Sequence, residues 1–152
     1  MTELERLREL LDASQVKLGV HIRRMNSSGS PVYRAAENLV PAVAILVVSL
    51  GATALLHFYL GAAVLAVGCW WWLTRYMPKV RDAVFDRTAA LVLTSERDFD
   101  FWWASGALSL YAKSGEGQEV AATRRTDWRQ WVRDLPADLT TLPTGAQDTG
   151  SV

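Results

Sequence analysis

The sequence predicts an all-α membrane protein, in which a two-span transmembrane helical hairpin carries N- and C-terminal cytoplasmic amphipathic helices. Three observations lead to this fold class. The 36 residues from 39 to 74 contain no Asp, Glu, Lys or Arg. This apolar run is about twice as long as one membrane span requires. Its most polar stretch, His57-Phe58-Tyr59, lies near its middle, where a turn between two spans would fall.

Composition divides the chain into five segments. We expect an N-terminal amphipathic helix in residues 1–26, a linker in 27–37, the hairpin in 38–77 with spans of about 39–56 and 60–76, a Trp-rich cytoplasmic helical region in 78–135, and a disordered tail in 136–152. The charged stretch from Met1 to Arg24 lacks the short apolar core of a cleaved signal peptide, so the first span should itself direct insertion.

The N-terminal helix is predicted to run from about residue 3 to residue 25. Thr2 and Glu5 form the T-x-x-E pattern of a capping box, which marks a helix start. One face of the helix carries a stripe of leucines at helical spacing, namely Leu4, Leu7, Leu11 and Leu18. This stripe can pair with a second copy, dock on the cytoplasmic part of the same chain, or lie on the membrane surface.

Length decides between one span and two. A single helix of 36 residues would be about 54 Å long, whereas the hydrocarbon core is about 30 Å thick. One helix would therefore need a tilt of about 56°, beyond the usual range. Basic residues flank both predicted spans and are absent from the turn. The positive-inside rule then places both termini in the cytoplasm, and we expect an integral protein of a bacterial inner membrane.

Small and hydroxyl-bearing residues mark the expected contact between the two spans. Close approach of membrane helices favours such side chains, and they recur here at four-residue spacing. The candidate hairpin contacts are Ser49, Thr53, Gly61, Ala62 and Ala66.

The Trp-rich region is predicted to contain three helices. The first continues the second span to about Leu93, the second starts at a Ser95 cap and carries the apolar stretch 101–111, and the third starts at Thr126 and stops at Pro136. A strand pair around the turn at 114–119 is an alternative for the second. Aromatic and basic residues of this region are the candidate contacts with a partner or the membrane surface: Trp102, Trp103, Trp128, Trp131, Arg125, Arg129 and Arg133. The alternative is that the Trp face of the last helix packs on the preceding helices.

The sequence contains few candidates for catalytic, metal-binding or cofactor-binding residues. Asp98-Phe99-Asp100 resembles a D-x-D metal motif in letters only, because two carboxylates at this spacing diverge on a helix. Its two histidines, His21 and His57, fall on opposite sides of the expected membrane, and no phosphate-binding loop is present. We therefore expect no enzyme, no catalytic residue, no metal and no cofactor.

Four arginines between residues 124 and 133 are offset by Asp127 and Asp134, which leaves a net charge of +2. This is too small to predict a nucleic-acid partner.

The expected function is that of a small integral membrane scaffold or accessory subunit. Its cytoplasmic helices would bind a partner protein, another copy of the chain or the bilayer surface. A holin-like or channel-like oligomer that permeabilises the membrane is one alternative, and a membrane-shaping hairpin is another.

Overall fold

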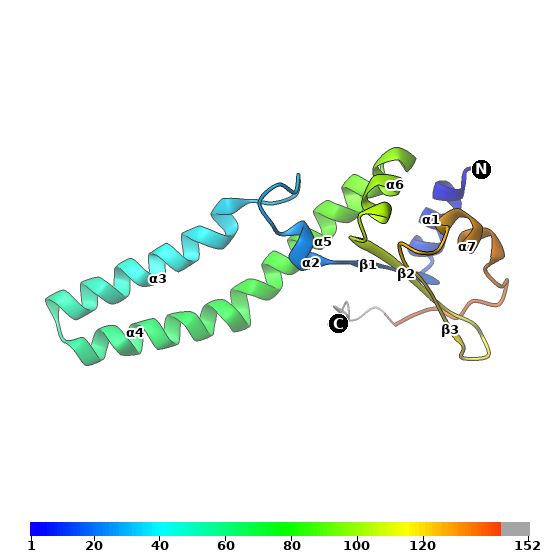
Figure 1. The fold of residues 1–152 in the computed structure, drawn as a ribbon. Helices are drawn as coiled ribbons and strands as arrows, with labels where there is room; N and C mark the ends of the chain where they lie inside the picture. Colours follow the sequence, from blue (N-terminus) through cyan, green and yellow to red (C-terminus); the bar gives the residue numbers. More distant parts are fainter. Residues whose placement is uncertain (144–152) are drawn as a thin grey trace. The chain divides into compact units, whose positions relative to one another are not determined.

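The fold is mixed, with helices and one antiparallel sheet (Figure 1). The structure is a computed structural model that describes residues 1–143. The elements follow the order α1 (Glu3–Asp12), β1 (Val16–Val20), α2 (Ile22–Met25), α3 (Ala35–Leu55), α4 (Phe58–Trp71), the π-helix η1 (Trp72–Tyr76), α5 (Met77–Val92), α6 (Glu96–Ala104), β2 (Leu108–Lys113), β3 (Glu119–Ala122) and α7 (Trp128–Asp134). The prediction of an all-α protein is therefore wrong.

The chain forms two compact units. Unit 1 combines Met1–Met25 with Asp86–Val152, and unit 2 is Asn26–Phe85. The boundary between them falls within α5. Unit 1 therefore takes its residues from both sides of the apolar run, which itself belongs to unit 2.

The N-terminal helix is shorter than predicted. The capping box is confirmed, since Thr2 N donates to Glu5 Oε2 over 2.7 Å and Glu5 N donates to Thr2 Oγ1. The helix ends at Asp12, and Ser14 adopts a left-handed φ of 56° that stops it. The following residues form β1 and bury Val16, Leu18 and Val20 on one face. Leu18 thus follows the two-residue period of a strand, although it also fits the helical leucine stripe.

The predicted second helix of the Trp-rich region is a helix followed by a strand. The Ser95 cap is confirmed, because its side chain accepts a hydrogen bond from Arg97 N. The helix α6 ends at Ala104, and Gly106 then adopts a φ of 76°, which favours glycine. β2 follows, and its alternate residues Leu108, Leu110 and Ala112 are buried. The strand pair around the turn at 114–119 is therefore the correct alternative.

The sheet has the order β1-β2-β3 and is antiparallel throughout. Leu18 pairs with Leu110, and Leu110 pairs with Ala122 on its other side. Because β1 precedes the apolar helices and β2 follows them, the sheet joins the two parts of unit 1.

The core of unit 1 also draws on both parts. Leu7 of α1 and Val16 of β1 are fully buried together with Phe99, Leu110 and Val132 from the C-terminal part. The region 78–135 is small for a self-sufficient core, and residues of the N-terminal segment complete it. The N-terminal segment is therefore a structural part of this unit and not a separate helix.

Within unit 2, α3 and α4 are antiparallel neighbours joined by a short turn (Figure 1). One helix of the described residues, α3, is long and apolar enough to cross a membrane. The second apolar segment does not match it, because α4 has 14 residues, about 21 Å at 1.5 Å each, before the helix changes to the π form at Trp72. The prediction of a two-span hairpin is therefore overturned.

The last described residues are held by the rest of unit 1. Leu139 bridges to Ser114, Thr140 N donates to Lys113 O over 2.8 Å, and Leu142 N donates to Ser14 O over 2.7 Å. The predicted disordered tail therefore does not begin at residue 136. Its remainder, 144–152, lies outside the described residues.

Candidate functional site

The surface of the α3–α4 pair is unusually apolar. The buried residue of α3 is Ser49 and that of α4 is Gly61, whereas Val47 is 61% exposed and Trp70 is 66% exposed. Other large apolar residues exposed on this pair include Leu39, Val40, Val43, Leu46, Val48, Leu50, Leu55, Phe58, Leu60, Leu65 and Val67. A helix of a water-soluble domain buries its large apolar side chains and exposes polar ones. This pair has the opposite arrangement.

The contact between α3 and α4 is made by small and hydroxyl-bearing residues. Ser49 Oγ donates to Gly61 O over 2.8 Å, and Thr53 Oγ1 donates to Ser49 O over 2.9 Å. A Cβ atom at Gly61 would lie 1.8 Å from Thr53 Oγ1 and 2.8 Å from the backbone oxygen of Ser49. Only glycine therefore fits at this point without moving one helix.

Three of the five predicted hairpin contacts meet in this way, namely Ser49, Thr53 and Gly61. Ala62 and Ala66 are exposed, so they do not lie in the contact. A further contact joins Gly68 to Ile45, whose Cγ2 atom would be 2.8 Å from a Cβ at position 68. The seven-residue spacing of Gly61 and Gly68 is the sequence signal for this second contact, since it returns to the same helix face.

His57 ends the turn between the two helices and caps α4. Its Nδ1 atom accepts a hydrogen bond from Tyr59 N over 3.3 Å, and its ring stacks on that of Tyr59 at 5.3 Å between centroids. Phe58 and Tyr59 are exposed beside it. The end of the helix pair therefore carries an aromatic cluster.

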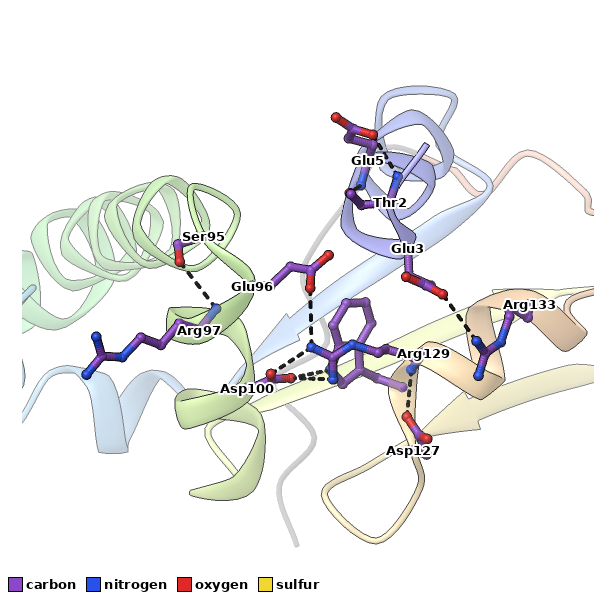
Figure 2. A network of polar contacts seen from close by, with 11 residues as sticks. Thr2, Glu3, Glu5, Ser95, Glu96, Arg97, Asp100, Asp127, Arg129 and Arg133 are labelled. Atoms are coloured by element: carbon purple, nitrogen blue, oxygen red, sulfur yellow. Dashed lines mark hydrogen bonds and ion pairs between the residues drawn. The ribbon is translucent and has the colours of Figure 1, made fainter.

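A polar network in unit 1 joins α6 to α7 (Figure 2). Arg129 donates to both carboxylate oxygens of Asp100, at 2.9 and 2.7 Å, and contacts Glu96 at 3.4 Å. Trp128 Nε1 donates to Asp100 Oδ1 over 2.8 Å, and the Arg129 guanidinium lies 4.7 Å from the Trp128 ring centroid. Both oxygens of this carboxylate accept hydrogen bonds from residues of α7, so Asp100 links the two helices.

The network sets the ionisation of Asp100. Partial burial raises the pKa of this carboxyl, but hydrogen bonds from Arg129 and Trp128 and the charge of Arg129 outweigh it, so the pKa lies below its usual value. The hydrogen bond to Asp100 likewise raises the pKa of Arg129. Both groups are therefore charged at neutral pH. In residues 1–143 no three His, Cys, Asp or Glu side chains are grouped closely enough to hold a metal ion.

The structure separates the residues predicted to contact a partner or the membrane surface. Trp103, Trp128 and Trp131 are buried in the core of unit 1, and Trp103 Nε1 donates to Thr126 O. This differs from the expected contact surface, because the Trp face of α7 packs inward against Phe99, whose ring centroid is 4.6 Å from that of Trp128. Trp102 stays partly exposed.

The structure also separates the three arginines that were predicted to contact a partner or the membrane surface. Arg129 is held by Asp100, and Arg133 pairs with Glu3 of α1 at 3.2 Å. Arg125 is exposed. The three arginines therefore do not act as one surface. Phe101, which the prediction did not include among the contacts, is 64% exposed and packs edge-on against Trp102.

Comparison with protein families, with curated proteins and with solved structures found no match to this chain.

Substituting Gly61 by Ala should loosen the α3–α4 contact. The added Cβ meets the Ser49 backbone oxygen, which cannot move aside as a flexible side chain can. Overpacking of this kind costs about 1–3 kcal/mol. We expect a lower midpoint of thermal unfolding for the full chain in mild detergent. Gly51→Ala is the matched control, since nothing lies within 4 Å of that Cβ position. Equal midpoints for the two variants would contradict the assigned contact.

Asp100→Asn should lower the free energy of unfolding by about 1 kcal/mol, because 42% of this side chain stays exposed and solvent screens the pair. The folded pKa is below the unfolded one, so this stability is complete above the unfolded pKa and is lost as the pH falls through the folded pKa. Urea unfolding of the full chain, followed by tryptophan fluorescence, measures both effects. Asp98→Asn in the same helix serves as control, and a loss that persists at acid pH would exclude the ion pair as its cause.

Proposed function

We propose that the protein is a membrane-anchored scaffold, in which the apolar surface of the α3–α4 pair is covered by lipid. The observation that carries the proposal is the inverted polarity of the pair, with Ser49 and Gly61 inside and large apolar residues outside. Contact with lipid tails suits such an apolar surface, whereas its exposure to water is unfavourable. α3 is the member of the pair that has spanning length.

Long apolar helices also occur in the cores of soluble proteins and in signal sequences, but α3 fits neither class well. A core helix of a soluble protein is mostly buried, whereas the most apolar window of α3 is only 11% buried. A cleaved signal sequence would remove the residues before it, and these include α1 and β1. Because Leu7 and Val16 from those elements lie in the core of unit 1, their removal would destroy that unit.

The sheet joins the segments that flank the helix pair. β1 and β2 are hydrogen-bonded neighbours, so the segment before the pair and the segment after it belong to one folded unit. Arg23, Arg24 and Arg34 precede the pair, and Arg75 and Lys79 follow it, whereas the turn has no basic residue. The positive-inside rule then favours the cytoplasmic face of a bacterial inner membrane for unit 1.

The scaffold part of the proposal concerns the exposed aromatic pair Phe101–Trp102 on α6. Their rings are 5.1 Å apart in an edge-on arrangement, and Phe101 keeps most of its surface exposed although Phe99 and Trp103 of the same helix are buried. Exposed rigid aromatic side chains are enriched in protein contacts. We assign the partner contact to this pair. Asp100 is committed to the α6–α7 network, so the proposal involves no catalysis.

A channel-like oligomer is less well supported. A water-filled pore needs polar side chains along one helix face. The hydroxyls of Ser49 and Thr53 are used inside the pair, and Thr74 Oγ1 donates to Trp70 O over 2.7 Å. Because these hydroxyl groups are already hydrogen-bonded within the helices, few polar groups remain to line a pore. No observation specifically favours a membrane-shaping hairpin.

Val47→Lys should weaken membrane insertion. Val47 is 61% exposed in the middle of α3, and a lysine at the centre of a membrane helix costs about 2.5–3.5 kcal/mol. We expect the wild-type chain to stay in the pellet after alkaline extraction of membranes, and a larger share of the variant to be released or degraded. Gln118→Lys in the turn of unit 1 is the control for the added charge. Release of the wild-type chain by alkali would refute the anchor.

A photo-cross-linking residue in place of Phe101 should capture the partner in intact cells as a species of defined mass. Either a second copy or another protein satisfies the proposal, since both bury the exposed ring. The same residue at Gln118 is the control and should give no such species. If the label at position 101 forms only lipid adducts, the scaffold assignment fails while the anchor remains.

A further inference from the structure

A recess with mixed aromatic and basic walls lies where α4 passes through η1 into α5. It is an open groove of about 420 Å³ and is lined by Trp70, Trp71, Arg75, Tyr76 and Lys79. All five residues belong to unit 2. None of them takes part in the α3–α4 contact or in the α6–α7 network.

The π-helix explains why these residues share one face. In an α-helix, residues five apart point about 140° away from each other. In η1 the backbone bonds over five residues, as Met77 N donates to Trp72 O, and this wider turn brings residues five apart closer to one face than an α-helix does. Trp71 and Tyr76 accordingly lie 6.0 Å apart between ring centroids. Trp70 and Arg75 have the same spacing. Turns of this kind occur frequently at functional sites.

The two cations of the recess are available to an external anion. Arg75 and Lys79 are exposed, and neither forms an ion pair with any residue in 1–143. Arg34, in contrast, is paired with Glu37, and Arg133 is paired with Glu3. Lys79 follows Arg75 by four residues, which brings both charges to the same recess.

The surroundings of the recess identify the anion. On one side it adjoins the apolar surface of α4 and η1, where Val67 and Leu73 are more than half exposed. Under the proposed function this surface meets hydrocarbon, so the recess lies at the level of the lipid headgroups. Tryptophan and tyrosine favour that level, and the anion found there is the phosphate of a phospholipid.

We propose that this recess binds the headgroup phosphate of an anionic phospholipid. The Arg75 guanidinium and the Lys79 ammonium donate to the phosphate oxygens, and Trp70, Trp71 and Tyr76 pack against the adjoining glycerol and acyl chains. The inference rests on the proposed function, because an unanchored chain would not bring the recess to a membrane. The inference adds to the proposed anchor a preference for anionic phospholipids.

Quenching of tryptophan fluorescence by brominated lipid tests the preference. The full chain is reconstituted into phosphatidylcholine bilayers that contain a minor share of either brominated phosphatidylglycerol or brominated phosphatidylcholine. We expect brominated phosphatidylglycerol to quench at a lower lipid fraction, and each cation to contribute about fivefold to this preference. Arg75→Gln with Lys79→Gln should abolish the preference and keep the quenching by phosphatidylcholine.

Arg81→Gln with Arg97→Gln removes the same charge outside the recess and should keep the preference. Arg75→Lys with Lys79→Arg retains both positive charges and should keep most of the preference. This result would show that the double Gln variant loses its preference through lost charge and not through misfolding. Equal quenching by both lipids in the wild-type chain, or a preference that survives the loss of Arg75 and Lys79, would overturn the inference. So would loss of the preference on adding millimolar inorganic phosphate, since the site would then accept free phosphate. No quenching by either lipid would instead refute the anchor itself.

Discussion

The antiparallel pairing of β1 with β2 is the constraint on which the rest of the structure depends. It joins a strand that precedes the apolar helices to one that follows them, and Leu18 and Leu110 are its central pair. The N-terminal segment then supplies Leu7 and Val16 to the core of unit 1, while α6 and α7 supply Phe99 and Val132. Because both flanking segments belong to one folded unit, the apolar helices form an insertion in the sequence between the two parts of that unit.

The polarity of the α3–α4 pair is the basis for its proposed contact with lipid. Ser49, Thr53 and Gly61 hold α3 against α4 by hydrogen bonds and close backbone approach, with few large side chains between the helices. A contact of this kind is favoured in lipid, where apolar burial between helices contributes little. The large side chains that would form a core in water face outward instead. The same surface leads into η1, where aromatic and basic residues gather beside it.

The sequence predicted features that depend on neighbouring residues. The charge-free run, the capping box of Thr2 and Glu5, the Ser95 cap and part of the α3–α4 contact could all be read from local spacing. The strands could not, because Leu18 fits both a helical stripe and a two-residue period, and only its distant partner Leu110 decides between them. The inward packing of Trp128 likewise depends on Phe99 of another helix. No sequence pattern marked the π-helix that assembles the recess.

The most direct measurement of the central claim is the accessibility of nitroxide labels in lipid vesicles. Each label replaces one residue in the Cys69→Ala chain, which removes the single native cysteine. A label at Val47 should collide more with oxygen, which concentrates in hydrocarbon, than with a water-soluble nickel complex, and a label at Gln118 should show the reverse. If position 47 were as open to the nickel complex as position 118, the helix pair would not lie in lipid, and the account of an anchored α/β unit would be contradicted.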